Sequence, residues 1–104
     1  MIFDYWIQDS KKKWVGTCQG SSDAQARDRA RVDYIYTVWG LHPSDREFRQ
    51  RKDEADALPT KVVLSLGSLQ YYQELRQRAI DGDPSLTASD LKDYKEFQHY
   101  FKRT

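Results

Sequence analysis

One short, largely apolar run, residues 61–66, stands apart from the alternating patterns along the rest of the chain. The only comparable stretch is an aromatic one at 34–39. The run is rich in β-branched valines, lies between a proline and a glycine, and is too short for a helix of its own. It therefore predicts a buried strand with Val62, Leu64 and Leu66 in the core, which the amphipathic elements of the chain would cover.

Residues 1–19 alternate between two kinds of position with a period of two, on either side of a polar turn at 9–12. This pattern predicts a β-hairpin. The buried face of the hairpin stays open, because the large apolar residue Trp6 lies on the opposite side to Phe3. Gly16 in the returning strand indicates either a bulge or a close approach of backbone.

A helix is expected over residues 20–40, where apolar residues recur at helical spacing. Ser22 and Gln25 fit a capping box at its start, in which the two side chains satisfy free backbone donors. Gly40 is typical of a helix end. The stretch 34–39 is apolar nearly all round, so we expect that end of the helix to be buried deepest.

The segment 41–60 carries four opposite-charge pairs at i,i+4 spacing, each contributing about 0.2–0.5 kcal/mol on an isolated helix. Ser44 and Glu47 fit a second capping box. Phe48 is the only large aromatic residue in the segment, which therefore has little to bury. We expect a charged, mobile helical segment that ends before Pro59; the alternative is a charged loop without helical structure.

Two further helices follow the apolar run. Ser68 is placed to cap the first, which would extend to Ile80. Thr87 would cap the second, with Asp90 three residues further on in the position of a capping box. Both segments carry an apolar stripe at helical spacing.

These elements predict an α+β fold, in which a small and largely antiparallel sheet packs against three or four helices. The sheet would consist of the N-terminal hairpin and the central strand 61–66. At 104 residues, the chain is expected to form a single domain, 1–104.

Composition excludes several classes of protein. The net charge of +1 excludes a strongly acidic DNA mimic and a strongly basic, histone-like protein. It does not exclude a local patch of charge of either sign. Cys18 is the only cysteine, so neither an intramolecular disulfide nor a zinc site of several cysteines is expected. The sequence contains no secretion signal and no apolar run approaching the ~20 residues of a membrane span. We expect a cytoplasmic protein with no membrane partner.

The sequence contains no grouping typical of an active site. His42 and His99 are the only histidines, and neither has an obvious nucleophile and acid partner. The stretch 81–92 begins like a calcium loop, but its sixth position is Leu86 and its twelfth is Lys92, where the loop requires glycine and glutamate. We therefore expect no enzyme activity, no cofactor and no bound metal.

Two surface features are candidates for partner binding. The first is the hairpin tip, where three lysines precede a tryptophan and could contact nucleic-acid phosphates while the indole stacks on a base. The alternative is that the lysines keep the tip solvated and blunt the sheet edges. Two arginines on one face of the first helix could extend the patch. The residues concerned are Lys11, Lys12, Lys13, Trp14, Arg27 and Arg31.

The second candidate is the charged segment. Phe48 could anchor it on a partner protein, with Arg46, Arg49 and Lys52 as neighbouring basic contacts. The alternative is a solvated insertion that has no partner.

We expect a small non-enzymatic binding protein that contacts a host protein or protein complex, as an inhibitor or adaptor. The order hairpin, helix, strand is similar to that of several small phage-encoded inhibitors, including some anti-CRISPR proteins, a resemblance of arrangement that implies a phage or mobile-element origin. The alternatives are nucleic-acid binding through the basic hairpin tip, and a structural or assembly subunit.

Overall fold

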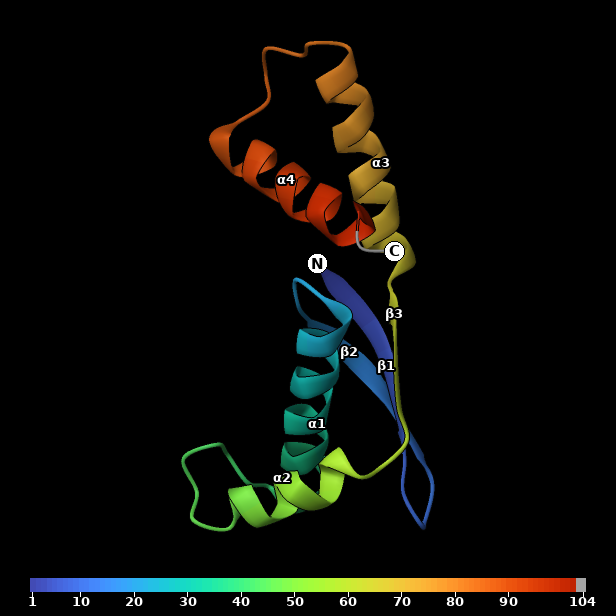
Figure 1. Ribbon diagram of the computed structural model, residues 1–104, viewed down its shortest axis with the longest axis vertical. Coiled ribbons are helices and arrows are strands. Elements are labelled where there is room, and N and C mark those ends of the chain that lie inside the picture. The colour runs from blue at the N-terminus through green and yellow to red at the C-terminus, as the bar shows by residue number, and fades with distance from the viewer. Residues whose placement is uncertain (103–104) are drawn as a thin grey trace.

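The computed structural model describes residues 1–102, in which three strands and four helices follow one another. The molecule is elongated, measuring 50 × 25 × 21 Å (Figure 1). The elements are β1 (Ile2–Gln8), β2 (Lys13–Gln19), α1 (Asp23–Trp39), α2 (Phe48–Asp56), β3 (Thr60–Leu64), α3 (Leu66–Ile80) and α4 (Ala88–Lys102).

The three strands form an antiparallel sheet in the order β2-β1-β3. This arrangement confirms the predicted α+β fold. The buried strand is β1, however, whose Phe3 and Ile7 are fully buried. The strand predicted at 61–66 is β3, which lies at an edge with Val62 and Leu64 only half-buried.

The prediction that Leu66 lies in a buried strand is wrong. Leu66 is the first residue of α3 and is 68% exposed. The strand ends at Ser65, whose hydroxyl accepts a hydrogen bond from the Ser68 backbone N–H at 3.2 Å and thereby caps α3. Ser68, expected to be that cap, instead accepts a bond from the Ile2 backbone N–H at 2.9 Å. A β-branched run indicates a strand, but its place in the sheet depends on pairing that sequence pattern does not reveal.

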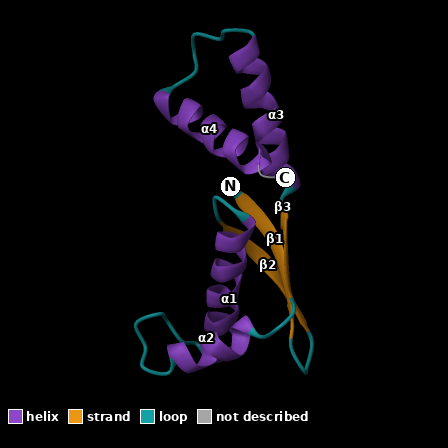
Figure 2. Ribbon diagram, viewed as in Figure 1, coloured by secondary structure: helices purple, strands orange, loops and turns teal. Residues whose placement is uncertain are grey.

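Helix α1 covers one face of the sheet, called here the inner face (Figure 2). The core of this lobe includes Tyr5, Ile7, Tyr34, Ile35 and Ala55. The C-terminal end of α1, which we expected to be buried deepest, is not: Tyr36 and Trp39 are about half exposed. One side of that end faces the core, whereas the other side is left uncovered.

Helices α3 and α4 form a second lobe at the other end of the molecule (Figure 1). The Tyr72 ring stacks with three aromatic rings of α4, the nearest being Phe101 at 4.8 Å between centroids. The two lobes meet where Phe3 packs edge-on against Tyr100 at 5.6 Å. The Tyr100 hydroxyl also donates to Asp23 Oδ1 at 2.8 Å, which ties α4 to the start of α1.

Two of the predicted helix ends are confirmed. Gly40 ends α1 in the left-handed conformation with φ 67°. Thr87 and Asp90 form a reciprocal capping box, because each side chain accepts a hydrogen bond from the backbone N–H of the other. At the start of α1, Ser22 caps as expected, but Gln25 Oε1 accepts its bond from the Ser21 N–H rather than from Ser22.

Within 41–60, the helix α2 is confirmed over Phe48–Asp56, while the capping box at Ser44 is wrong. Glu47 precedes α2 without a side-chain cap, and the turn before it is closed by Asp45, which accepts a bond from the His42 N–H at 2.7 Å. Helix α2 packs on α1, to which the ion pair between Lys52 and Asp28 also joins it.

Candidate functional site

The outer face of the sheet is the face turned away from α1. In the described residues no helix packs across it, although α3 reaches the end of β1. Its side chains alternate with the buried ones along each strand. They are Ile2, Asp4, Trp6 and Gln8 of β1, Lys13, Val15, Thr17 and Gln19 of β2, and Lys61 and Val63 of β3.

Trp6 lies at the centre of this outer face. It stands opposite Val15 on one side and opposite Lys61 on the other. Val15 is 74% exposed and Val63 is 53% exposed. The Lys13 ammonium lies 4.7 Å from the centre of an indole ring of Trp6, within the range of a cation–π contact. These residues line a shallow hollow of about 450 Å³.

The residues beneath the outer face explain why Trp6 points outwards. Tyr5 lies on the inner face opposite Gly16, and its hydroxyl donates a hydrogen bond to the Asp33 carboxylate of α1. Burial and this bond together raise the pKa of Tyr5 well above its ordinary value. A Cβ on residue 16 would lie only 2.8 Å from the Tyr5 hydroxyl oxygen. The group that lies close to Gly16 is thus the Tyr5 side chain, and not the backbone that the sequence pattern predicted; its position fixes which side chains face the core.

Asp9 organises the hairpin tip. One carboxylate oxygen accepts bonds from the backbone N–H groups of Lys11 and Lys12, both at 2.8 Å. The other accepts from Trp14 Nε1 at 2.7 Å and from the Tyr34 hydroxyl at 2.9 Å. The backbone bond from Lys12, followed by the other donors, holds the pKa of Asp9 well below its ordinary value. The carboxylate therefore has a structural role in the tip.

The structure places Trp14 on the inner face. Its ring packs edge-on against Tyr34 at 6.0 Å and belongs to the apolar contacts around the core. The Lys12 ammonium lies 3.8 Å from the centre of its ring. Lys12 therefore occupies one face of the ring on which a base was expected to stack. Lys11, Lys12 and Lys13 themselves are exposed, as expected for a cationic tip.

The two arginines predicted to extend the tip are only partly available. Arg31 donates to Thr60 Oγ1 at 3.3 Å, and its guanidinium lies 3.8 Å from Asp56, so it joins α1 to α2 and β3. Arg27 is half-buried on α1.

The structure also turns the predicted anchor of the charged segment inwards. Phe48 is half-buried and packs on the core. Lys52 pairs with Asp28 at 2.6 Å and with Asp56 at 2.8 Å, and only 18% of its side chain is exposed. Arg46 and Arg49 remain exposed. Two of the four predicted contact residues, Phe48 and Lys52, are therefore engaged within the same chain.

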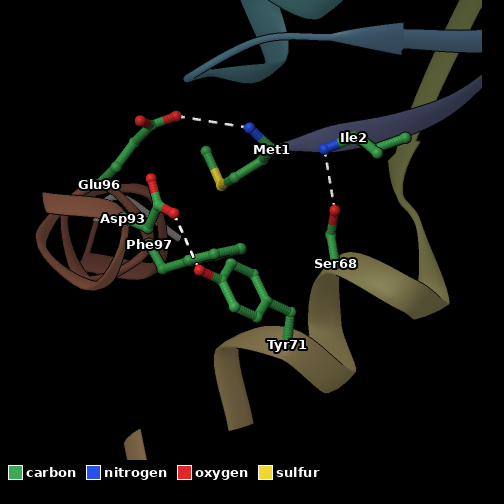
Figure 3. A pocket seen from close by; sticks show the side chains of 7 residues that line it. All are labelled: Met1, Ile2, Ser68, Tyr71, Asp93, Glu96 and Phe97. Carbon is green, nitrogen blue, oxygen red and sulfur yellow. Dashed lines mark hydrogen bonds and ion pairs between the residues drawn. The ribbon is translucent and has the colours of Figure 1, made fainter. Parts of the chain in front are cut away.

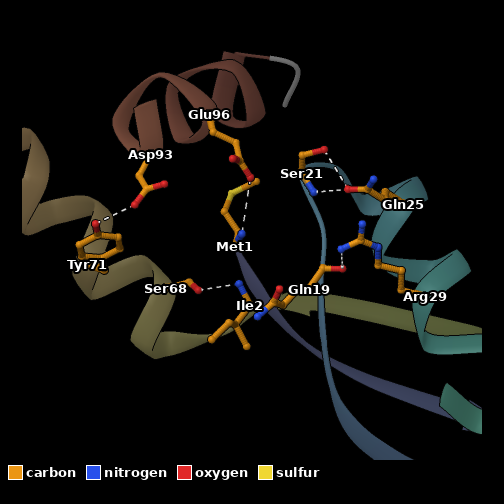
Figure 4. A network of polar contacts seen from close by, with 10 residues as sticks. All are labelled: Met1, Ile2, Gln19, Ser21, Gln25, Arg29, Ser68, Tyr71, Asp93 and Glu96. Carbon is orange, nitrogen blue, oxygen red and sulfur yellow. Dashed lines mark hydrogen bonds and ion pairs between the residues drawn. The ribbon is translucent and has the colours of Figure 1, made fainter. Parts of the chain in front are cut away.

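A smaller cavity of about 200 Å³ lies where the lobes meet (Figure 3). Its polar groups bind one another. Tyr71 donates to Asp93 at 2.9 Å, and that bond is the main cause that raises the pKa of Tyr71 to about 12. The amino group of Met1 lies 3.5 Å from Glu96. Figure 4 shows these contacts together with the hydrogen bond that Gln25 accepts from Ser21 at the start of α1. Beside this cavity, the contacts of Met1 with Glu96 and of Ile2 with Ser68 join the sheet to the helical lobe.

Comparison with known proteins finds no matching family model, no matching curated protein and no matching solved structure. Among residues 1–102, no three His, Cys, Asp or Glu side chains are grouped so that they could hold a metal ion. No helix in that part of the chain is long and apolar enough to span a bilayer. The geometry of the surface is therefore the basis for a functional proposal.

The outer face was not predicted, because large apolar residues on both sides of the hairpin leave its orientation open. A usable signal was present. Gly16 leaves space for a large residue on its own face of the sheet, and Tyr5 is that residue once the register of the hairpin is set by its short turn. That assignment would have placed Trp6 on the opposite face.

Proposed function

We propose that this chain is a non-enzymatic protein-binding module, an inhibitor or adaptor, and that it binds its partner through the outer face of the sheet. The observation that carries the proposal is the exposure of Val15 and Val63 around Trp6, on a face that no helix covers within residues 1–102. A solvated sheet face normally carries polar side chains. An exposed apolar group with a polar rim is typical of an interaction surface.

The composition of the face supports a protein partner. Tryptophan is enriched among residues that dominate binding energy, particularly when it lies at the centre of a contact. Trp6 lies at the centre of the outer face. Lys13 and Lys61 form a charged rim around it, which would favour a partner with acidic residues around an apolar patch. A phage or mobile-element origin, of the anti-defence type, belongs to the same proposal and is tested by the neighbouring genes.

The test is a comparison of tryptophan variants. The tagged chain is purified from the cells that encode it, and the affinity for a co-purified complex of fixed stoichiometry is measured by calorimetry. Trp6→Thr removes the indole but leaves a residue that favours strands, and it should weaken binding by about 2 kcal/mol or more. Trp39→Thr is the matched control, because Trp39 is 48% exposed at the end of α1, away from the outer face.

Equal affinity of Trp6→Thr and the wild-type chain would refute the proposed face, as would a loss of binding confined to Trp39→Thr. Circular dichroism of both variants checks that the fold is retained.

One observation favours nucleic-acid binding as a second candidate. Trp6 lies on an exposed sheet surface between Lys13 and Lys61, an arrangement that could stack a base and bind phosphates. Binding of single-stranded DNA and RNA oligonucleotides is measured by fluorescence anisotropy over a range of salt concentrations. If this candidate is correct, changing both lysines to alanine should reduce the salt slope by about 1.4 units. Salt-independent or absent binding would eliminate it.

A further inference from the structure

Strand β3 pairs with another strand along one side only. The Ser65 N–H donates to the Ile2 carbonyl at 2.9 Å, and the Gln8 N–H donates to the Pro59 carbonyl at 3.1 Å. Because bonded residues alternate along an antiparallel ladder, these two bonds fix which groups of β3 face β1. The N–H and C=O groups of Thr60, Val62 and Leu64 consequently point away from β1, along the free edge of the sheet.

This edge has only part of the protection that natural edge strands carry. Such strands are blunted by a covering element, a bulge, a short length, or charged side chains, lysine above all. Of these, β3 has a length of five residues and one lysine, and Figure 1 shows no described segment beyond β3 on its free side. Its only charged side chain, Lys61, lies on the outer face and stands opposite Trp6. By contrast, the other edge is partly occupied, because Arg29 of α1 donates to the Gln19 carbonyl of β2 at 3.4 Å.

We propose that β3 pairs antiparallel with β3 of a second copy of this chain, about a two-fold axis at Val62, so that the two sheets join into one of six strands. In this register Val62 faces Val62 of the second copy, Thr60 faces Leu64, and Lys61 faces Val63. All five residues of the strand then pair. A two-fold contact of this kind uses the same surface on both copies and closes upon itself.

Charge selects this register. A slip of two residues in one direction would set Lys61 opposite Lys61 of the second copy, and like charges directly opposite destabilise a sheet. A slip of two residues in the other direction would leave part of each strand unpaired.

The chosen register also brings opposite charges together. In the described part of a single copy, neither Asp4 nor Lys61 takes part in an ion pair. Asp4 stands opposite Val63. In the joined sheet, Lys61 of the second copy approaches Val63 from the other side, two strands and roughly 9–10 Å from Asp4. This pairing occurs twice by symmetry.

Five residues of paired edge bury less than the ~800 Å² per partner of a standard stable interface. The dimer is therefore weak, with a dissociation constant on the order of 0.1 mM. It forms through an edge of the sheet and leaves the outer face of both copies free, so it stands independently of the proposed function.

Two substitutions at Val63 give a decisive test by sedimentation equilibrium. Val63→Glu places a carboxylate opposite Lys61 of the second copy, whereas Val63→Lys places an ammonium there. Because each contact occurs twice, the dimer dissociation constant should be at least about tenfold lower for Val63→Glu than for Val63→Lys at low salt. The difference should shrink in 1 M salt.

The two Val63 substitutions change the stability of the single chain in the opposite sense to their effect on the dimer. Asp4 stands opposite Val63 in the same copy, so Val63→Lys favours the monomer fold and Val63→Glu disfavours it. A dimer effect that follows our prediction therefore cannot arise from monomer stability. Thr17 provides the matched control, because it faces Asp4 from β2. Thr17→Glu and Thr17→Lys should leave the dimer dissociation constants equal to each other within about twofold.

Hydrogen exchange supplies a second measurement on the wild-type chain. The protein concentration is raised from about 10 µM to about 1 mM, a range that brackets the expected dissociation constant. Over this range the amides of Thr60, Val62 and Leu64 should become protected from exchange. The amides of Lys61 and Val63 face β1 and should be protected throughout. A chain that stays monomeric at 1 mM with those three amides unprotected would overturn the proposal. So would a dimer whose affinity is the same for both Val63 variants, because another surface would then hold it.

Discussion

Replacing Gly16 by alanine should destabilise the fold, because the added methyl group has no space. A Cβ at this position would lie 2.8 Å from the Tyr5 hydroxyl oxygen and 2.9 Å from the ring carbon that carries it. Real Cβ atoms essentially never approach another heavy atom within 3.0 Å. The Tyr5 ring cannot easily retreat, because it is only 6% exposed, packs beneath α1 and is hydrogen-bonded to Asp33.

The expected cost is about 1–3 kcal/mol, the range for overpacking a core. For a domain of this size, each kcal/mol lowers the melting temperature by roughly 4–8 °C. Urea unfolding followed by circular dichroism gives the free energy of unfolding directly, and an unchanged m-value would show that the loss is one of native-state stability.

Gly67→Ala is the matched control. It makes the same chemical change inside α3, where no atom lies within 4 Å of the added carbon. This variant should be more stable than wild type by about 0.4–1 kcal/mol, because alanine reduces the entropy of the unfolded chain. If Gly16→Ala unfolded at the wild-type urea concentration while Gly67→Ala behaved as expected, the register that places Tyr5 over Gly16 would be wrong.

Two further predictions concern single polar contacts. Because the pKa of Asp9 is lowered in the folded state, its carboxylate stabilises the fold above the unfolded pKa of 3.8, and this stabilisation is lost as the pH falls through the folded pKa. Asp9→Asn should therefore unfold at lower urea than wild type at pH 7, with a smaller difference at pH 3. Tyr100→Phe removes the bond to Asp23 and should cost about 0.5–1.5 kcal/mol, with faster amide exchange in α4 than in β1; equal stability would show that the bond contributes nothing to the contact between the lobes.

The elements of the fold could be predicted from local pattern, whereas their burial could not. The caps at Ser22 and Thr87 and the stop at Gly40 depend on neighbouring residues in the sequence, and all three are present. The burial of β3 depends on which strand pairs beyond it. An apolar run such as 61–66 is equally compatible with a central strand and with an edge strand that covers part of one core.

The candidate site was predicted in part for a similar reason. Sequence alone indicates that the lysines of the tip are exposed, and they are. Alternation alone does not distinguish the two tryptophans of the hairpin, because both lie in alternating strands; Gly16 does so only once the register that places it opposite Tyr5 is known. Their separation depends on Asp9, which binds the Trp14 indole from 2.7 Å, and on Gly16, which admits Tyr5 to the inner face. The packing of Phe48 on the core could not be predicted either, because a charged segment gives no local sign of the core beneath it.

The central strand links the proposed binding face to both lobes. Phe3 contacts Tyr100 of the helical lobe, while Ile7 belongs to the core beneath α1. Side chains alternate along β1, so each outward residue is held in place by buried neighbours on either side of it. Ile2 is consequently positioned from the helical lobe and Trp6 from the sheet core. A change that loosens the helical lobe should therefore disturb the Ile2 end of the face first, while leaving the environment of Trp6 and its lysine neighbours intact.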